Sequence, residues 1–142
     1  VGEVENVDVS VIQTLQNGGF VPVVSPIAFG AGGETFNVNA DLAAAAIARA
    51  LGASKLLLLT DVAGVYRDFS DKSSLIAQMT PVEARELIES GAVSTGMIPK
   101  IACCIEAVEN GVARAHIVDG REPHSILVEL FTDAGCGTMI SH

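Results

Sequence analysis

A run of four leucines, Leu56-Leu57-Leu58-Leu59, constrains the fold more than any other feature of the chain. Lys55 and Asp61 bound the run, so it is far too short to cross a membrane and has the length of a strand. Consecutive apolar residues without alternation are typical of a strand whose two faces are both covered. The leucine run therefore predicts a sheet with helices on each side.

Extended and helical segments alternate along the rest of the chain, which predicts an α/β fold with a mostly parallel sheet sandwiched by helices. Thr80-Pro81-Val82-Glu83 has the pattern of a capping box with proline at the first helical position. Gly30-Ala31-Gly32-Gly33 predicts a hairpin tip, because the strand that follows it does not fit the Walker or dinucleotide-binding patterns. We expect extended segments at 1–7, 20–25, 27–29, 35–38, 55–60, 76–79, 113–118 and 138–140, and helices at 9–17, 39–51, 81–90, 97–110 and 124–131.

Composition narrows the class of partner. The 142 residues carry a formal net charge of −9, which argues against nucleic-acid binding because there is no basic patch to release counterions. The mean hydropathy of +0.46 is high, so either both sheet faces are covered or a missing neighbour covers part of the surface. Cys103, Cys104 and Cys136 follow no zinc or disulfide spacing and favour reduced thiols in a cytosol-like compartment. Because the chain starts at Val1 rather than Met, we interpret it as an excised or processed piece.

Polar residues follow the predicted strands, at the edge where open α/β sheets bind ligands. Thr60 and Asp61 end the leucine strand and lead into a turn of small residues that contains Gly64. A turn of this kind lets a flat base or a ribose approach the backbone. The alternative is that Asp61 only caps the following turn.

A second group of polar residues surrounds two predicted helix starts. Asn39 is a good helix cap and Asp41 suits the first turn, whereas a structural role explains Asn37 poorly. Lys100 lies in the first turn of the 97–110 helix, where a cation opposes the helix dipole. A phosphate held between Lys100 and the exposed N–H groups of that turn would account for this placement. The alternative is a solvated lysine with a free headgroup.

Three of these segments together resemble a known family. Leu59-Thr60-Asp61-Val62-Ala63-Gly64-Val65 is similar to a stretch found widely in the amino-acid kinase superfamily. Asn37-Val38-Asn39-Ala40-Asp41 and Gly96-Met97-Ile98-Pro99-Lys100, with Gly137-Thr138-Met139-Ile140 at the end, are more specific and resemble the acetylglutamate kinases of arginine biosynthesis. The resemblance covers essentially the whole chain.

The resemblance implies transfer of the ATP γ-phosphoryl group to the side-chain carboxylate of N-acetyl-L-glutamate. It assigns Lys100 to the charge on the transferred group, Asp41 to orienting the catalytic lysines and Asn37 to the acetylglutamate. Magnesium would be held mainly by the phosphates of ATP rather than by protein ligands. The implied nucleotide-binding residues are Thr60, Asp61, Gly64, Tyr66, Ser94 and Met97.

The chain also departs from the family pattern. The family's glycine-rich phosphate loop, second catalytic lysine and substrate-gripping arginine have no counterpart here. Residues 1–53 resemble the tail of the substrate lobe, and residues 54–142 resemble the nucleotide-binding lobe. We therefore expect an incomplete part of the enzyme that does not turn over alone.

The carboxyl-terminal region resembles the arginine-inhibited branch of the family, in which His116, Glu129 and the backbone near Gly135 would bind arginine. An exposed helix glutamate is the alternative interpretation of Glu129. That branch is homo-oligomeric, and in plants and cyanobacteria the signalling protein PII binds the family. Asp71-Lys72-Ser73-Ser74 resembles the plant form. We expect a cytoplasmic location, with the plastid stroma as the alternative for a plant or algal protein.

Two other functions stay open at this point. The chain could be a regulatory module that senses arginine or a partner protein without catalysing a reaction. A nucleotide-binding module for NAD is a third possibility, which the absence of the glycine fingerprint disfavours.

Overall fold

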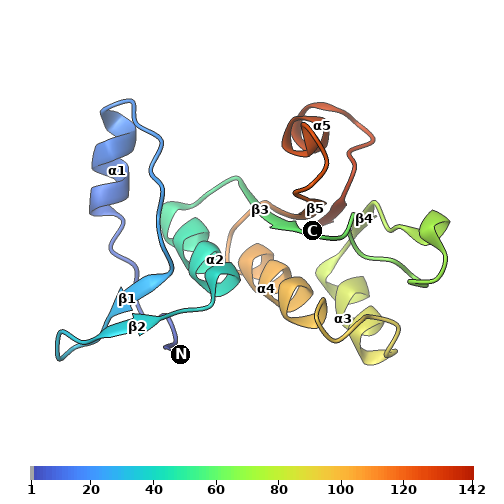
Figure 1. The fold of residues 1–142 in the computed structure, drawn as a ribbon, viewed down its shortest axis with the longest axis horizontal. Helices are drawn as coiled ribbons and strands as arrows, with labels where there is room; N and C mark the ends of the chain where they lie inside the picture. Colours follow the sequence, from blue (N-terminus) through green and yellow to red (C-terminus); the bar gives the residue numbers. More distant parts are fainter. Residues whose placement is uncertain (1) are drawn as a thin grey trace.

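The computed structural model describes residues 2–142 and contains a four-stranded sheet, a separate hairpin and five α-helices (Figure 1). The strands are β1 (Ile27–Phe29), β2 (Thr35–Asn37), β3 (Lys55–Thr60), β4 (Gln78–Met79), β5 (Arg114–Asp119) and β6 (Thr138–Ser141). The helices are α1 (Ser10–Asn17), α2 (Ala40–Leu51), α3 (Pro81–Glu89), α4 (Ile98–Glu109) and α5 (Ser125–Phe131), with a short 3-10 helix at Lys72–Ser74.

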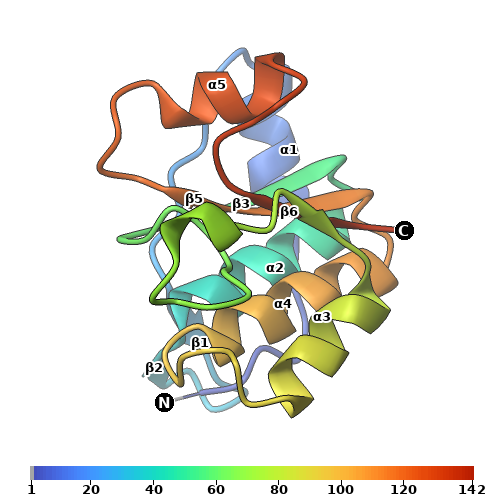
Figure 2. The same ribbon diagram turned by 90° about the vertical axis from the view of Figure 1, so that its right-hand side faces the viewer.

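The sheet has the strand order β3-β5-β6-β4. β3 is parallel to β5 and β4 is parallel to β6, whereas β5 and β6 are antiparallel. Figure 2 shows α2, α3 and α4 beneath this sheet and α5 above it. The predicted α/β fold, with a mostly parallel sheet between helices, is confirmed.

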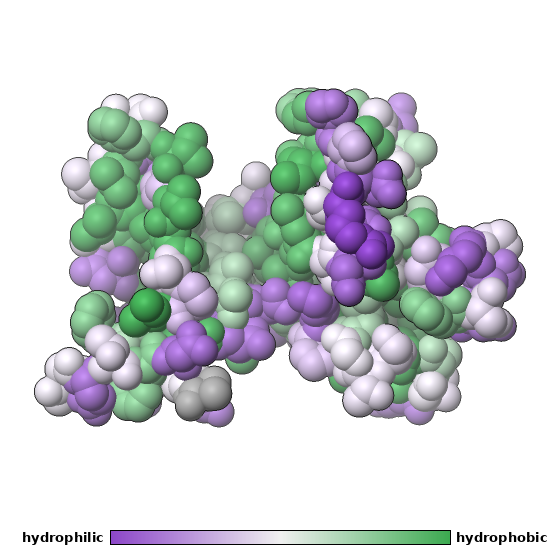
Figure 3. Space-filling view, viewed as in Figure 1, coloured by the Kyte–Doolittle hydropathy of each residue, from purple (hydrophilic) through white to green (hydrophobic). Residues whose placement is uncertain are grey.

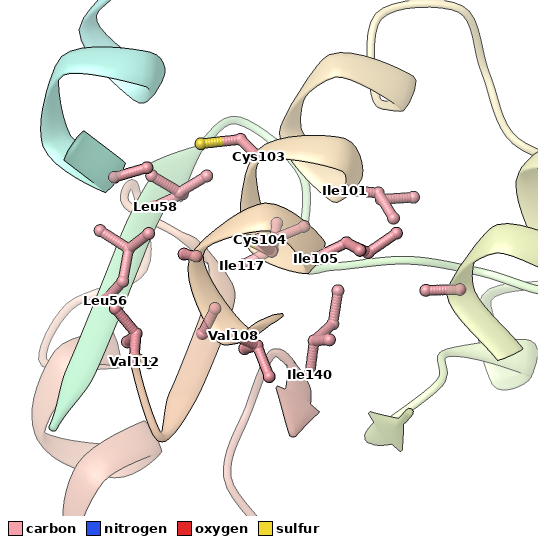
Figure 4. Packing of buried hydrophobic residues seen from close by; sticks show 14 of the residues in the cluster. Leu56, Leu58, Ile101, Cys103, Cys104, Ile105, Val108, Val112, Ile117 and Ile140 are labelled. Carbon is pink, nitrogen blue, oxygen red and sulfur yellow. The ribbon is translucent and has the colours of Figure 1, made fainter. Parts of the chain in front are cut away.

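The hydrophobic core lies between the sheet and α4 (Figure 4). The buried residues of this helix are Ile101, Cys103, Cys104, Ile105, Ala107 and Val108. Both adjacent cysteines pack in this core, and burial raises the pKa of the Cys103 thiol to about 11. The main core side chains are Leu56, Leu58, Ile101, Cys104, Ile105, Val108, Ile117 and Ile140.

The local signals read from the sequence are present. The Thr80 hydroxyl accepts from the N–H of Glu83, and the Glu83 carboxylate accepts from the N–H of Thr80, which completes the capping box of α3. The Asn39 side chain accepts from two N–H groups in the first turn of α2. Gly52 ends α2 in the left-handed conformation, with φ of 61°. β1 and β2 form the predicted antiparallel hairpin around the glycine-rich tip.

The predicted strand at residues 20–25 is wrong. This segment has no strand partner among residues 2–142, and its apolar side chains are exposed, to 88% for Val21 and 96% for Val23. Apolar composition predicts burial, but a strand also requires a neighbouring backbone to hydrogen-bond with. Part of the segment faces α2 across an apolar cavity of about 860 Å³. In Figure 3, which has the view of Figure 1, the left-hand part of the molecule that contains this segment has a largely hydrophobic surface.

None of the helices formed by the described residues is both long enough and apolar enough to cross a lipid bilayer.

Candidate active site

Lys100 and Asp41 meet where the first turns of α4 and α2 come together. The Lys100 Nζ atom lies 2.8 Å from Asp41 Oδ2, and both side chains are about one quarter exposed. The fold thus joins two residues that are 59 positions apart in the sequence. The Lys100 headgroup is paired rather than free, so the solvated-lysine interpretation is wrong. A cation held in the first turn of a helix, at the positive end of the helix dipole, can bind a phosphate.

Cys103 adds a second link between α4 and Asp41. Its thiol donates to the backbone carbonyl oxygen of Asp41, with a sulfur–oxygen distance of 3.1 Å. The raised pKa of this thiol keeps it protonated, and able to donate, at neutral pH. Lys100 and Cys103 are three residues apart, so they share one face of α4. That spacing is the sequence signal for this contact.

Asn37 precedes Asp41 by four residues in the sequence. It is the last residue of β2 and is exposed, and its side chain has no hydrogen-bond partner among residues 2–142. Asn39, two residues later, caps α2, and Asp41 follows in the first turn of that helix. The hairpin and the start of α2 therefore place an uncommitted amide and the paired carboxylate on one short segment.

The carboxyl ends of β3 and β5 bring together the polar residues that follow them. Thr60 is in register with Asp119, and the Thr60 hydroxyl donates to Asp61 Oδ1 over 3.3 Å. Arg121 binds Asp119 through two side-chain nitrogens, at 3.0 and 2.8 Å. These hydrogen bonds lower the pKa of Asp119 from its ordinary value of 3.8 to about 2. Sequence reasoning found Thr60 and Asp61 but missed the Asp119–Arg121 pair.

A small cavity of about 80 Å³ lies between the loop after β3 and the segment before α4. Of the six residues expected to bind the nucleotide, Gly64, Tyr66, Ser94 and Met97 line it, whereas Thr60 and Asp61 do not. A Cβ atom on Gly64 would lie 2.5 Å from Thr138 Oγ1, so packing already requires a glycine there. The remaining lining residues are Val62, Val65, Phe69, Ala92 and Val93.

The residues expected to bind arginine line a second cavity, of about 500 Å³, on the α5 side of the sheet. His116, Glu129 and Gly135 all border it. Lys55 and Asp133 also border it, and no sequence pattern indicated either residue as a ligand-binding residue. The cavity therefore offers charges of both signs to a ligand.

Glu129 is buried, at 9% exposure, so the interpretation as an exposed helix residue is wrong. Its Oε1 atom lies 2.7 Å from His116 Nδ1, and Oε2 accepts from the N–H groups of Cys136 and Gly137 at 2.8 and 2.9 Å. Burial tends to raise the pKa of Glu129, but these hydrogen bonds outweigh it and hold the pKa below its ordinary value. Oε1 keeps one free acceptor position for a ligand.

Comparison with known proteins identifies the family. The model of the amino acid kinase family matches residues 1–119, which is most of the chain. The chain belongs to the amino acid kinase family. The expected superfamily is thus confirmed, and with it the fold.

Within this family, the chain is most informatively compared with proteins named acetylglutamate kinase. The chain is 56% identical to the acetylglutamate kinase of Caldanaerobacter subterraneus subsp. tengcongensis over 140 residues, which are 99% of this chain and 47% of that protein. It is 53% identical to the acetylglutamate kinase of Nostoc sp. over the same shares. The chain thus spans about half the length of the curated relatives it matches.

A solved structure shares nearly the whole fold. The N-acetylglutamate synthase of Neisseria gonorrhoeae, complexed with coenzyme A and N-acetyl-glutamate, superposes with a TM-score of 0.91 at 31% identity. The match covers 100% of this amino acid kinase family member and 32% of the synthase chain.

Proposed function

We propose that this chain contributes the nucleotide half of an acetylglutamate kinase site, which transfers the γ-phosphoryl group of ATP to the side-chain carboxylate of N-acetyl-L-glutamate in arginine biosynthesis. The observation that carries the proposal is the Lys100–Asp41 pair, 2.8 Å apart at two facing helix starts. The 56% identity to a named acetylglutamate kinase supports the choice of substrate over other members of the family.

The proposed chemistry relies on charge and positioning. Phosphoryl transfer needs no covalent enzyme intermediate, so the protein contributes by holding the reactants in line and stabilising the charge on the transferred group. Lys100 supplies a cation for that charge, and Asp41 fixes where the cation lies. Asn37 offers an exposed amide to the acetylglutamate from the neighbouring segment.

ATP and Mg²⁺ fit the residues present. Among residues 2–142, His, Cys, Asp and Glu side chains form no cluster of three or more that could hold a metal ion. Magnesium therefore needs phosphate oxygens among its ligands, which is how sites for phosphorylated substrates commonly hold it. We assign the base and ribose of ATP to the cavity lined by Tyr66, Ser94 and Met97, and to the strand-end residues Thr60 and Asp61.

The proposal treats residues 1–53 as the tail of the substrate lobe and residues 54–142 as the nucleotide-binding lobe. The γ-phosphoryl group needs cations on both its attacking and its leaving side, and we assign only Lys100 to this role. We therefore expect no turnover by the 142-residue chain alone. The remaining groups come from the part of the relatives that lies outside the match, which is about half their length.

A chimera tests this function directly. These 142 residues replace the matching part of the Caldanaerobacter acetylglutamate kinase, and acyl phosphate is trapped with hydroxylamine. The chimera should form hydroxamate only with both ATP and N-acetyl-L-glutamate, at a rate near that of the parent, while the isolated chain forms none. A folded chimera without activity beside an active parent would contradict the proposal.

A regulatory function has its own supporting observation, because His116, Glu129 and Gly135 line one cavity. We propose that this cavity binds arginine. The free acceptor position on Glu129 Oε1 would accept a hydrogen bond from the guanidinium group. A match with 31% identity and a TM-score of 0.86 to the N. gonorrhoeae N-acetylglutamate synthase complexed with coenzyme A and L-arginine agrees with this choice. Arginine should raise the melting temperature of the chain more than lysine does, and equal shifts would contradict arginine binding.

The remaining partner expectations stay proposals. Homo-oligomer formation rests on the resemblance to the arginine-inhibited branch, and PII binding rests on the loop at residues 71–74. Homo-oligomer formation, PII binding and a plastid or cytoplasmic location are all proposals about the full-length protein.

A further inference from the structure

The loop after β3 carries a cluster of two aromatic rings and one cation. Tyr66 and Phe69 pack edge to face, with ring centroids 5.8 Å apart and an angle of 87° between the rings. The Lys72 Nζ atom lies 3.9 Å from the centroid of Phe69 and 4.7 Å from that of Tyr66. It also lies 3.3 Å from the backbone oxygen of Phe69, to which it donates. Both distances to the rings fall within the range of attractive cation–π contacts.

The loop holds this cluster in one arrangement. Tyr66 and Leu75 form an isolated antiparallel bridge that closes the base of the loop. The Ser74 hydroxyl oxygen lies 2.8 Å from the backbone oxygen of Asp68 and 2.7 Å from that of Asp71, so its one hydrogen is shared between them. These contacts hold the loop without Lys72, which adds one hydrogen bond to the Phe69 backbone and its contacts with the two rings.

The same two rings form part of the small cavity before α4. Tyr66 and Phe69 border it from one side, and Ala92, Val93 and Ser94 come from the segment between α3 and α4. No side chain that lines the cavity carries a charge. Phe69 remains 52% exposed, so its ring covers the cavity only in part.

This cavity lies beside the start of α4, the helix that carries Lys100. Met97, which also borders the cavity, immediately precedes α4, and Lys100 follows three residues later on the same side of the helix. An uncharged, aromatic-walled cavity one helical turn from a phosphate-binding lysine suits the base of a nucleotide whose phosphates lie at Lys100. An uncharged lining gives a phosphate group no cation, so the cavity suits the base end of the ligand.

We propose that Phe69 is a base-binding residue, on whose exposed ring the purine of ATP stacks, and that Lys72 is a positioning residue that holds Phe69 and Tyr66 in place. The proposal rests on the proposed nucleotide binding and adds to it the residues that recognise the base. The sequence did not single out Phe69, and it singled out Lys72 only as part of a partner-binding loop.

The test separates the base from the phosphates. Binding of Mg-ATP and of Mg-tripolyphosphate to the 142-residue chain is measured by calorimetry for the wild type and Phe69→Ala. Loss of one stacked aromatic should weaken ATP binding by about 5- to 150-fold and leave tripolyphosphate binding unchanged. The control is Phe29→Ala, because Phe29 is 79% exposed on β1, away from this cavity, and both affinities should persist.

Lys72 is tested with two variants. Lys72→Met removes the charge but keeps the length of the side chain, and should weaken ATP binding by about 2- to 5-fold. Lys72→Arg keeps the cation over the rings and should stay within about twofold of the wild type. Tyr66 is the only tyrosine and there is no tryptophan, so its ring resonances report on this cavity alone. ATP should shift these resonances and tripolyphosphate should not.

The possible results distinguish the two proposals. If the wild type binds Mg-ATP while Phe69→Ala keeps the wild-type ratio of ATP to tripolyphosphate affinity, base stacking on Phe69 is overturned and nucleotide binding stands. If Lys72→Met matches the wild type, the positioning role of Lys72 is overturned. If the folded wild type binds Mg-tripolyphosphate, and binds Mg-ATP no more tightly than that, the cavity is not a base site. If it binds neither, the proposed function fails as well.

Discussion

The contacts of Lys100 show how a single side chain acquires a chemical role from two helices. Its ammonium group is held by Asp41 from α2, while Cys103 from its own helix donates to the backbone of Asp41. The sequence indicated Lys100 because a cation at a helix start is unfavourable by itself. It could not show Cys103 acting on Asp41, because that contact depends on how α2 and α4 pack.

Lys100→Ala in the chimera should lower kcat by about 10²- to 10³-fold with a smaller change in KM for ATP, because the lost interaction is made mainly in the transition state. Steady-state kinetics with hydroxamate detection measures both constants. Arg85→Ala is the matched control, since Arg85 is an exposed cation on α3 whose partner is Glu109. A kcat within a few-fold of the parent would make Lys100 a surface residue.

Glu129 gives the clearest prediction on stability. Glu129→Gln replaces a buried acceptor of three hydrogen bonds with an amide that cannot accept them all, and should lower the free energy of unfolding by about 2–5 kcal/mol. Urea unfolding at neutral pH measures this difference. Glu122→Gln, at an exposed position, should change it by less than about 0.5 kcal/mol.

The stabilisation by Glu129 should depend on pH with a defined sign. Its folded-state pKa lies below the ordinary value of 4.5, so the stabilisation is complete above that pH and is lost as the pH falls through the folded-state pKa. The difference in stability between the wild type and Glu129→Gln should therefore shrink in acid. A difference that grows on acidification would contradict the contacts described.

At the scale of elements, the sequence predicted best where the signal is local. The capping box of α3, the Asn39 cap and the β1–β2 hairpin all depend on residues within a few positions of one another. The segment at residues 20–25 failed because strand formation depends on a distant partner, which apolar composition does not reveal. The antiparallel pairing of β5 with β6 was likewise not specified by the interleaving of strands and helices.

The capping box itself can be tested on α3. Thr80→Ala removes the acceptor for the Glu83 N–H and the hydroxyl that donates to Glu83 Oε2, and should cost about 0.5–2 kcal/mol of stability. Thermal unfolding followed by circular dichroism measures the loss. Glu86→Ala, on the exposed side of the same helix, should stay within about 0.5 kcal/mol of the wild type.

At the scale of the whole molecule, the exposed segment after α1 explains part of the high mean hydropathy. Phe20, Val21 and Val23 are 67%, 88% and 96% exposed, and the apolar cavity of about 860 Å³ lies beside this segment. The sequence left two explanations open, covered sheet faces and an uncovered surface, and both features occur in the described residues. A segment with exposed apolar side chains and unpaired backbone groups promotes association.

The wild-type chain should therefore self-associate, and Val21→Lys with Val23→Glu should shift it toward the monomer without changing its circular-dichroism spectrum. Sedimentation velocity over a range of protein concentrations measures this shift. Val82→Lys, at an exposed position on α3, is the matched control and should leave the association unchanged. A wild type that stays monomeric throughout the range would contradict the prediction.

The central claim is that this chain carries a nucleotide site built on Lys100, and calorimetric titration of Mg-ATP into the folded 142-residue chain tests it most directly. We predict weak, saturable binding by the wild type. Lys100→Met should weaken it further because the phosphates lose their cation. A wild type with a folded circular-dichroism spectrum and no heat of binding, or equal affinities for the two chains, would contradict the account.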